Sequence, residues 1–214
     1  MKLPRTFFAR DTRTVARELL GTMLVRGMDD GTRLSGRIVE TEAYRPGDAA
    51  AHSYRKQTPR NAPMFMQAGT SYVYFTYGMH FCFNVVTEDE GVGAAVLVRA
   101  LEPLEGIVRM QQNYAEARRG RSETSPYPIK NLCRGPARLC KAMRIDCAYT
   151  GYDMLQEGSS LFIEQGAAIE NERVATSARI GVSGDVLAKT IAWRWFVQDS
   201  AFVSRRAPNP DSRL

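Results

Sequence analysis

The stretch Gly69–Asn84, G-T-S-Y-V-Y-F-T-Y-G-M-H-F-C-F-N, decides how the chain is interpreted. Its first half has the character of a strand, with Tyr72 and Tyr74 facing one way and Val73 and Phe75 the other. The alternation stops at Tyr77-Gly78 and β-type residues resume at His80, which predicts a hairpin with Tyr77 at or near its tip. Tyr77 either folds back into the core or projects outward as a wedge. In a basic protein, a wedge suggests stacked nucleic-acid bases.

Around the hairpin lies a chain of 214 residues, enough for one sizeable domain or two small ones. Its 29 Lys and Arg residues exceed its 23 Asp and Glu residues, which gives a net charge of +6 and a pI near 9.3. This balance favours a polyanionic partner without proving one. Arginines gather at Arg118, Arg119 and Arg121 and again at Arg134 and Arg138; both groups could equally be solvated surface.

The cysteine and histidine content argues against a metal centre. The four cysteines (Cys82, Cys133, Cys140 and Cys147) form no C-x-x-C pair, and the chain has only two histidines. With no secretory signal, we expect free thiols in a reducing compartment, the cytoplasm. No segment reaches about 18 uninterrupted apolar residues, so we expect no membrane span.

Leu34–Tyr44, L-S-G-R-I-V-E-T-E-A-Y, predicts a strand that carries Ile38, Glu40, Glu42 and Tyr44 on one side. Two carboxylates and a tyrosine make a poor hydrophobic face. The segment is therefore either an edge strand with a solvated acidic face or the framework of a functional pair of acids.

Two further segments supply candidate polar groups. The turn-rich stretch 45–63 predicts a long loop that contains His52, which is either solvated or functional. Ala94–Leu101 predicts an apolar strand with one charge, Arg99. A buried arginine needs a partner, which is either a structural acid or Glu42.

The remaining elements complete an α+β fold. We expect a single domain over 1–214, with a curved, mainly antiparallel sheet flanked by helices and a protruding β-hairpin. Arg134 and Arg138 flank a helix start and could form a phosphate site there. Helices are predicted over 11–21, over Pro103–Arg119 and from Pro136; strands over 22–26, 160–164 and 191–197; a mobile loop over 120–130; a loop over 179–184; and a polar tail over 207–214.

Five segments, in this order, resemble the alkyladenine (3-methyladenine) DNA glycosylases, and the resemblance extends from Ala16 to about Val197. The segments are G-R-I-V-E-T-E-A-Y (Gly36–Tyr44), Q-T-P-R-N (Gln57–Asn61), S-Y-V-Y-F-T-Y-G-M-H-F-C-F-N (Ser71–Asn84), V-R-A-L-E-P-L-E-G (Val98–Gly106) and G-P-A-R-L-C (Gly135–Cys140).

The resemblance implies hydrolysis of the N-glycosidic bond of an alkylated or deaminated purine after the nucleotide leaves the DNA stack. It implies that Tyr77 is the wedge and that Glu42 is the general base for a water. Arg99 and a backbone carbonyl near Val182 would hold this water. Glu40 would then be structural.

The same resemblance implies a base pocket made of Tyr44, His52 and Tyr74, with Asn84 guarding against normal guanine. It implies that Met79 and His80 contact DNA, as we expect of Arg134 and Arg138. No lysine matches a pocket position, so no imine with the sugar and no strand cleavage is expected. The implied partner is double-stranded DNA with damaged purines, bound by a monomer without metal or organic cofactor.

Two other interpretations remain open from the sequence. A non-enzymatic nucleic-acid-binding domain would use the same arginines and aromatic residues but not Glu42. A sugar hydrolase would use Glu40 and Glu42 as a carboxylate pair, but that interpretation leaves Tyr77 and the positive charge unexplained.

Overall fold

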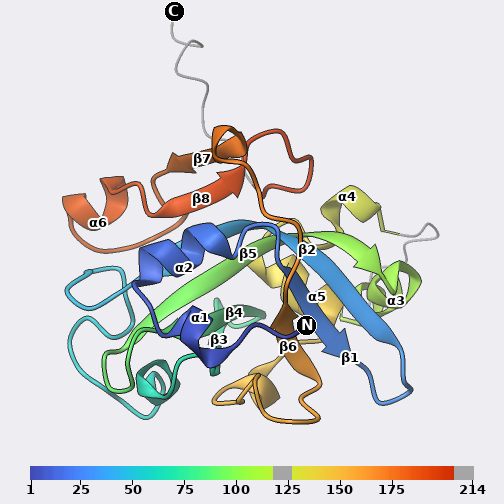
Figure 1. The fold of residues 1–214 in the computed structure, drawn as a ribbon, viewed down its shortest axis with the longest axis horizontal. Helices are drawn as coiled ribbons and strands as arrows, with labels where there is room; N and C mark the ends of the chain where they lie inside the picture. Colours follow the sequence, from blue (N-terminus) through green and yellow to red (C-terminus); the bar gives the residue numbers. More distant parts are fainter. Residues whose placement is uncertain (118–126, 205–214) are drawn as a thin grey trace, which may run out of the picture.

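The computed structural model of the protein describes residues 1–117 and 127–204, which are built around one eight-stranded sheet (Figure 1). Its main path runs β3-β4-β5-β2-β1-β6, β8 joins β2, and β7 joins β8. Each strand pairing is antiparallel, which confirms the predicted α+β class and sheet type. The strands are β1 (Met23–Gly27), β2 (Arg33–Tyr44), β3 (Ser71–Thr76), β4 (His80–Thr87), β5 (Ala94–Glu105), β6 (Leu161–Glu164), β7 (Val174–Ser177) and β8 (Arg194–Val197).

Strand β2 lies inside the sheet, so the edge-strand interpretation of residues 34–44 is wrong. It pairs with β5 along one side. On the other side its first half pairs with β1 and residues 40–42 pair with β8. Glu40 and Glu42 are both completely buried. Neither is part of a solvated acidic face.

A β-bulge separates Ile38 from the two carboxylates. The register between β2 and β5 shifts between Ile38 and Glu40 and again between Glu40 and Thr41. An extra residue in one strand breaks the alternation of side chains. Ile38 accordingly packs in the main hydrophobic core, whereas Glu40 and Glu42 bind arginines. The prediction that Ile38, Glu40, Glu42 and Tyr44 share one side is wrong at Ile38.

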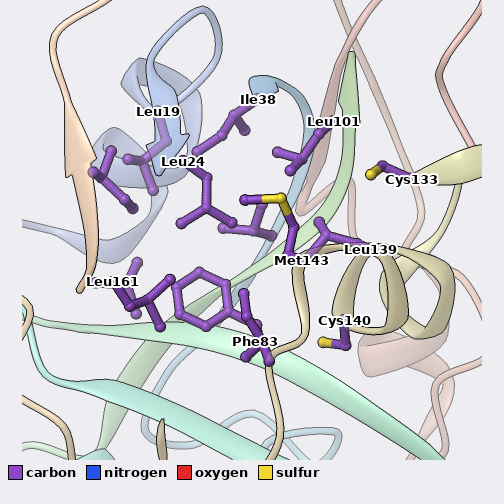
Figure 2. Close-up of a cluster of buried hydrophobic side chains, with 14 of the residues drawn as sticks. Leu19, Leu24, Ile38, Phe83, Leu101, Cys133, Leu139, Cys140, Met143 and Leu161 are labelled. Atoms are coloured by element: carbon purple, nitrogen blue, oxygen red, sulfur yellow. The ribbon is translucent and has the colours of Figure 1, made fainter. Parts of the chain in front are cut away.

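The main core lies where sheet and helices meet. Asp11 caps α2 (Thr12–Glu18) by accepting bonds from the backbone N–H groups of Arg13 and Thr14. Figure 2 shows core side chains contributed by both kinds of element, among them Leu24, Ile38, Phe83 and Leu101 from strands and Leu139 and Met143 from α5 (Pro136–Met143). The other helices are α1 (Arg5–Phe8), α3 (Ile107–Glu116), α4 (Ile129–Leu132) and α6 (Val186–Thr190), with single 3-10 turns at Ala62–Phe65, Cys147–Tyr149 and Asn171–Arg173.

The helix predicted to start at Pro103 starts later. β5 continues to Glu105, and Pro103 pairs with Gly36 inside the sheet. The turn into α3 comes at Gly106, whose φ of 69° lies in the left-handed region that favours glycine. The helix is followed to Glu116, and its predicted end at Arg119 falls outside the described residues.

Several other predictions concern parts of the chain that the structure covers incompletely. Arg118, Arg119, Arg121 and the tail 207–214 lie outside the described residues, as does most of the predicted 120–130 loop. The predicted end of that loop at Lys130 is wrong, because α4 begins at Ile129. β6 confirms the strand predicted over 160–164, whereas β8 is shorter than predicted and begins at Arg194.

The four cysteines are free thiols, as predicted; Cys82, Cys133 and Cys140 are buried and Cys147 is exposed. Among residues 1–117 and 127–204, no helix combines the length and apolarity that a membrane crossing requires.

Candidate active site

A cavity of about 390 Å³ opens where the β3–β4 hairpin, the end of β2, the loop 180–183 and the start of α5 meet. It brings together residues that are far apart in the sequence, among them the predicted site residues Tyr44, His52 and Arg99. The lining includes Tyr44, His52, Tyr72, Tyr74, Tyr77, Cys82, Asn84, Leu97, Arg99, Pro136, Ile180 and Val182. Arg99 is the only charged side chain among the described residues that line it.

The hairpin tip places Tyr77 at the mouth of this cavity. Tyr77 is 81% exposed, so its ring does not fold back into the core. Its φ is 51° and that of Gly78 is 66°, and the Met79 N–H donates to the Thr76 carbonyl at 3.3 Å. Positive φ at both central residues is the pattern of a type I′ turn. A bulky residue in this region is uncommon and indicates a constraint on the tip.

Three aromatic rings form one wall. The rings of His52 and Tyr74 lie 4.5 Å apart in an edge-to-face arrangement, and those of Tyr72 and Tyr74 lie 5.5 Å apart. The His52 Nδ1 atom and the Tyr72 hydroxyl are hydrogen-bonded at 2.8 Å. Desolvation against these rings, with the positive charge of Arg60 as a smaller cause, lowers the pKa of His52. Burial raises the pKa of Tyr74, so at neutral pH the wall carries no charge.

Asn84 lies on the same strand pair and is held by backbone. Its Nδ2 donates to the Tyr72 carbonyl at 2.9 Å and to the Cys82 carbonyl at 3.4 Å. Both carbonyls are acceptors, so they fix the orientation of the amide. The group that Asn84 can present to the cavity is therefore Oδ1, a hydrogen-bond acceptor.

Glu42 lies directly behind the cavity wall and does not itself line the cavity. Its Oε1 accepts from the Ile180 N–H at 2.8 Å and faces Arg99 Nη1 at 3.2 Å, while its Oε2 accepts from the Tyr44 hydroxyl at 2.7 Å. Tyr44, Arg99 and Ile180, the residues that supply these donors, all line the cavity. Only one shell of donors therefore separates the carboxylate from the space beside the aromatic wall.

Arg99 binds both carboxylates of β2. Its Nε donates to Glu40 Oε1 at 3.0 Å and its Nη1 faces Glu42. The pairing of Arg99 with Glu42 is thus confirmed, and the structural-acid alternative is also present, in Glu40. Glu40 in addition accepts from Arg194 and Ser204.

Sequence reasoning did not identify the role of Arg179. Its guanidinium pairs with Asp48, donates to the Ala43 carbonyl at 2.9 Å and lies 4.7 Å from the centre of the Tyr44 ring. Burial, and then the charge of Glu42, raise the pKa of Tyr44 well above its ordinary value. Arg179 immediately precedes Ile180, so one loop supports both the ring and the carboxylate. A lone arginine in R-I-G-V-S-G carries no pattern that predicts this.

The residues predicted to contact DNA are divided between two places. Met79, His80 and Arg138 line a second cavity of about 900 Å³ between β4, α3 and α5. Arg134 donates from Nε to the Val203 carbonyl at 2.8 Å. Arg134 lines neither of the two cavities, and the joint phosphate site of Arg134 and Arg138 at the start of α5 stays a prediction. Val182 lines the first cavity, as expected.

Comparison with known proteins agrees with this geometry. The family model described as methylpurine-DNA glycosylase (MPG) matches residues 6–201. The chain belongs to the methylpurine-DNA glycosylase family. Membership makes the protein a DNA glycosylase, a hydrolase of DNA repair, as the sequence resemblance implied. The non-enzymatic alternative is thereby set aside.

The chain is similar to several bacterial glycosylases over most of its length, all carrying the name "Putative 3-methyladenine DNA glycosylase". The relative from Francisella tularensis (strain FSC 198) is 45% identical over 192 residues, 89% of this chain and 92% of that protein. The relative from Carboxydothermus hydrogenoformans is 43% identical over 206 residues, 96% and 100% of the two chains. The relative from Herpetosiphon aurantiacus is 40% identical over 202 residues, 94% and 88%.

The described part of this glycosylase offers no metal-binding cluster, since no three His, Cys, Asp or Glu side chains are grouped to hold an ion within residues 1–117 and 127–204. No lysine lines the first cavity in the same part of the chain. The chemistry available at the wall is that of aromatic rings, one arginine and the carboxylate behind it.

Proposed function

We propose that this glycosylase flips alkylated or deaminated purines out of duplex DNA into the cavity of about 390 Å³ and hydrolyses their N-glycosidic bond with Glu42 as general base. One observation carries the proposal: the aromatic cavity has a fully buried carboxylate one donor shell behind its wall and an exposed aromatic tip at its mouth. This combines a place for the base, a group to activate water and a side chain to fill the stack.

Binding of the base would rest on Tyr44, His52 and Tyr74. Stacking of a nucleic-acid base on an aromatic side chain contributes about 1–3 kcal/mol, comparable with the few kcal/mol needed to unstack a nucleotide. Alkylation at N3 or N7 makes a purine cationic, and electron-rich ring faces attract cations. An uncharged His52 fits this role because an imidazolium would repel such a base. Asn84, whose amide is held by the Tyr72 and Cys82 carbonyls at the cavity lining, is the proposed guard, because its side chain would crowd the 2-amino group of normal guanine.

Tyr77 would enter the duplex and occupy the space that the flipped nucleotide leaves. Its turn is already formed in the free protein, so the ring needs no ordering step. Met79 and His80, which follow it, would contact DNA beside the wedge, together with Arg134 and Arg138.

For hydrolysis, a water must reach the Glu42 carboxylate. The Ile180 N–H is backbone and Arg99 is held by Glu40, so the Tyr44 hydroxyl is the donor that gives way most readily. The water, held also by Arg99 and a carbonyl near Val182, attacks C1′ and its proton passes to Glu42. The C1′–N bond breaks and its electron pair goes to the purine. A cationic base is thereby neutralised, whereas a neutral base such as hypoxanthine leaves as an anion that takes up a proton from solvent. The sugar is left abasic, with a hydroxyl on C1′.

The step forms no covalent bond between protein and sugar. An imine would require a primary amine near C1′, and the described lining of the cavity contains no lysine. The proposed enzyme is therefore monofunctional: it releases the base and leaves the strand intact.

The decisive experiment replaces Glu42 with Gln. Gln keeps the size of Glu and cannot take a proton from water, so we expect the single-turnover rate of hypoxanthine or 7-methylguanine release to fall by about a thousandfold. Binding to the same duplex should stay within about threefold of wild type, as expected when only the transition state loses an interaction.

Glu157→Gln, the same change at an exposed turn residue, is the matched control and should retain the wild-type rate. Excision retained by Glu42→Gln would eliminate Glu42 as the base. Absence of base release by the wild type from all damaged duplexes would eliminate the reaction.

A further inference from the structure

The second carboxylate of β2, Glu40, lies outside the cavity lining and takes no direct part in the hydrolysis just proposed. We propose that Glu40 is a positioning residue for the same reaction: it holds Arg99 so that the guanidinium supports Glu42 without closing over it. This inference rests on the proposed function and adds a residue to it.

The guanidinium of Arg99 bridges two acids that are two residues apart on one strand. Its Nε is bonded to Glu40 and its Nη1 faces the same Oε1 of Glu42 that accepts from the Ile180 N–H. All three side chains are almost or fully buried, with side-chain exposures of 8% for Arg99 and 0% for both acids. The guanidinium is planar. While its Nε is bound to Glu40, only the adjacent side of the group, which carries Nη1, can face Glu42.

Glu40 can hold Arg99 because it is itself fixed from other elements. Its Oε1 accepts from Arg194 Nε at 2.8 Å and from Ser204 Oγ at 2.8 Å, and its Oε2 accepts from the Ser204 N–H at 2.6 Å. Arg194 comes from β8, which pairs with β2 at this point. The cluster contains two carboxylates, Glu40 and Glu42, and two guanidinium groups, Arg99 and Arg194, so its formal charges cancel.

Loss of the Glu40 carboxylate would release the Nε edge of Arg99. The planar fork of arginine favours bidentate pairing with a carboxylate, and the nearest one would be Glu42. A guanidinium closed on Glu42 occupies the oxygens that a water needs. Hydrolysis would therefore slow, while base binding would be preserved because Glu40 does not line the cavity.

The test is a double-mutant cycle on single-turnover release of hypoxanthine from a duplex oligonucleotide, with rates normalised to the active-site concentration. We expect Glu40→Gln to lower the rate by about ten- to a hundredfold, the size of effect that a misplaced catalytic group produces. In an Arg99→Gln background the same change should cost no more than about twofold, since residues that act through one another are not additive. Binding to a duplex with a non-hydrolysable abasic-site analogue should stay within about twofold in every variant.

Glu164→Gln serves as the comparator, because it is the same change and removes the ion pair of a β6 carboxylate with Arg33 without touching Glu40, Arg99 or Glu42. We expect its rate to stay within about threefold of wild type. Should Glu40→Gln fail to fold, Glu40→Asp, which withdraws the carboxylate by one methylene, replaces it in the same cycle.

Three results would overturn the inference: an unchanged rate for the Glu40 variant, an equal loss with and without Arg99, or an equal loss in Glu164→Gln. These outcomes differ from failure of the proposed function. That failure would appear as a wild type that releases no damaged purine, or as a Glu42→Gln variant that retains excision, whatever the result of the cycle.

Discussion

At the scale of single residues, the tip of the hairpin makes a sharp prediction. Tyr77 is exposed in a left-handed turn, which suits a side chain that enters DNA rather than one that supports the fold. Tyr77→Ala should slow excision of hypoxanthine from a fully paired duplex by about tenfold or more, because the vacated stack is no longer filled.

At a mispaired lesion the nucleotide is easier to extrude, so the same Tyr77 variant should lose much less. The measurement is the ratio of single-turnover rates for the two duplexes. An equal loss on both would remove the wedge role and leave Tyr77 as a general DNA contact.

His52 provides a prediction about pH. Desolvation lowers its pKa, so the ring stays neutral from pH 7 down past the ordinary value of about 6.5 and charges only below it. An imidazolium repels a cationic purine more than a neutral one. The ratio of 7-methylguanine to hypoxanthine excision should therefore be constant above about pH 6.5 and fall at lower pH.

In that comparison the titration of a shared catalytic group cancels, since it affects both substrates. His52→Gln should make the ratio independent of pH, whereas His80→Gln should keep the wild-type profile of the ratio. A fall that persists in His52→Gln would assign the effect to another group.

At the scale of elements, the junction between β5 and α3 depends on Gly106. Its φ is 69°, and a Cβ there would lie 2.5 Å from a Leu34 methyl and 2.6 Å from the Arg33 carbonyl oxygen. Gly106→Ala should lower the free energy of unfolding by about 2–3 kcal/mol, from backbone strain together with this clash. Denaturant unfolding measures the change.

Gly31 is the matched control for this junction. Its φ of 82° is similar, but a Cβ there would meet nothing within 4 Å. Gly31→Ala should therefore lower the free energy of unfolding by only about 1 kcal/mol, from backbone strain without a clash. Equal losses at both glycines would mean that the contact with β2 is relieved by a small shift.

The elements also show which parts of the fold the sequence could reveal. The hairpin follows a local alternation of side chains and the apolar part of β5 a short apolar run, and both predictions are confirmed. β2 was predicted as a strand, but its bulge and its central place in the sheet were not. The helix predicted from Pro103 was wrong because proline is favoured at the start of a helix but is also tolerated in a strand where its missing N–H leaves no hydrogen bond unmade. The pairing with Gly36 that decides the matter involves a segment 67 residues earlier.

For the molecule as a whole, the site residues that lie in family motifs could be predicted from the sequence. The residues that reach the site only through tertiary contacts could not. The resemblance supplied Glu42, Arg99, Tyr44, His52 and Tyr74, and the fold brings them together. It did not supply Tyr72, the third ring of the wall. Arg179, Arg194 and Ser204 reach the site from the last quarter of the chain through ion pairs and backbone contacts. Their local sequences are ordinary, so only the tertiary structure identifies them.

The pairing of β2 on both edges has a consequence for evolution. Because side chains alternate between the two faces of a sheet, inserting or deleting one residue between positions 40 and 44 would turn the following side chains of β2 to the opposite face, so we expect this segment to keep its length. The loop that carries His52 lies between strands and is freer to change length, whereas the loop that carries Val182 is tied to Glu42 through the Ile180 N–H. We therefore expect lesion preference to diverge between related enzymes through the His52 loop, while Glu42, Arg99 and their supporting residues keep their places.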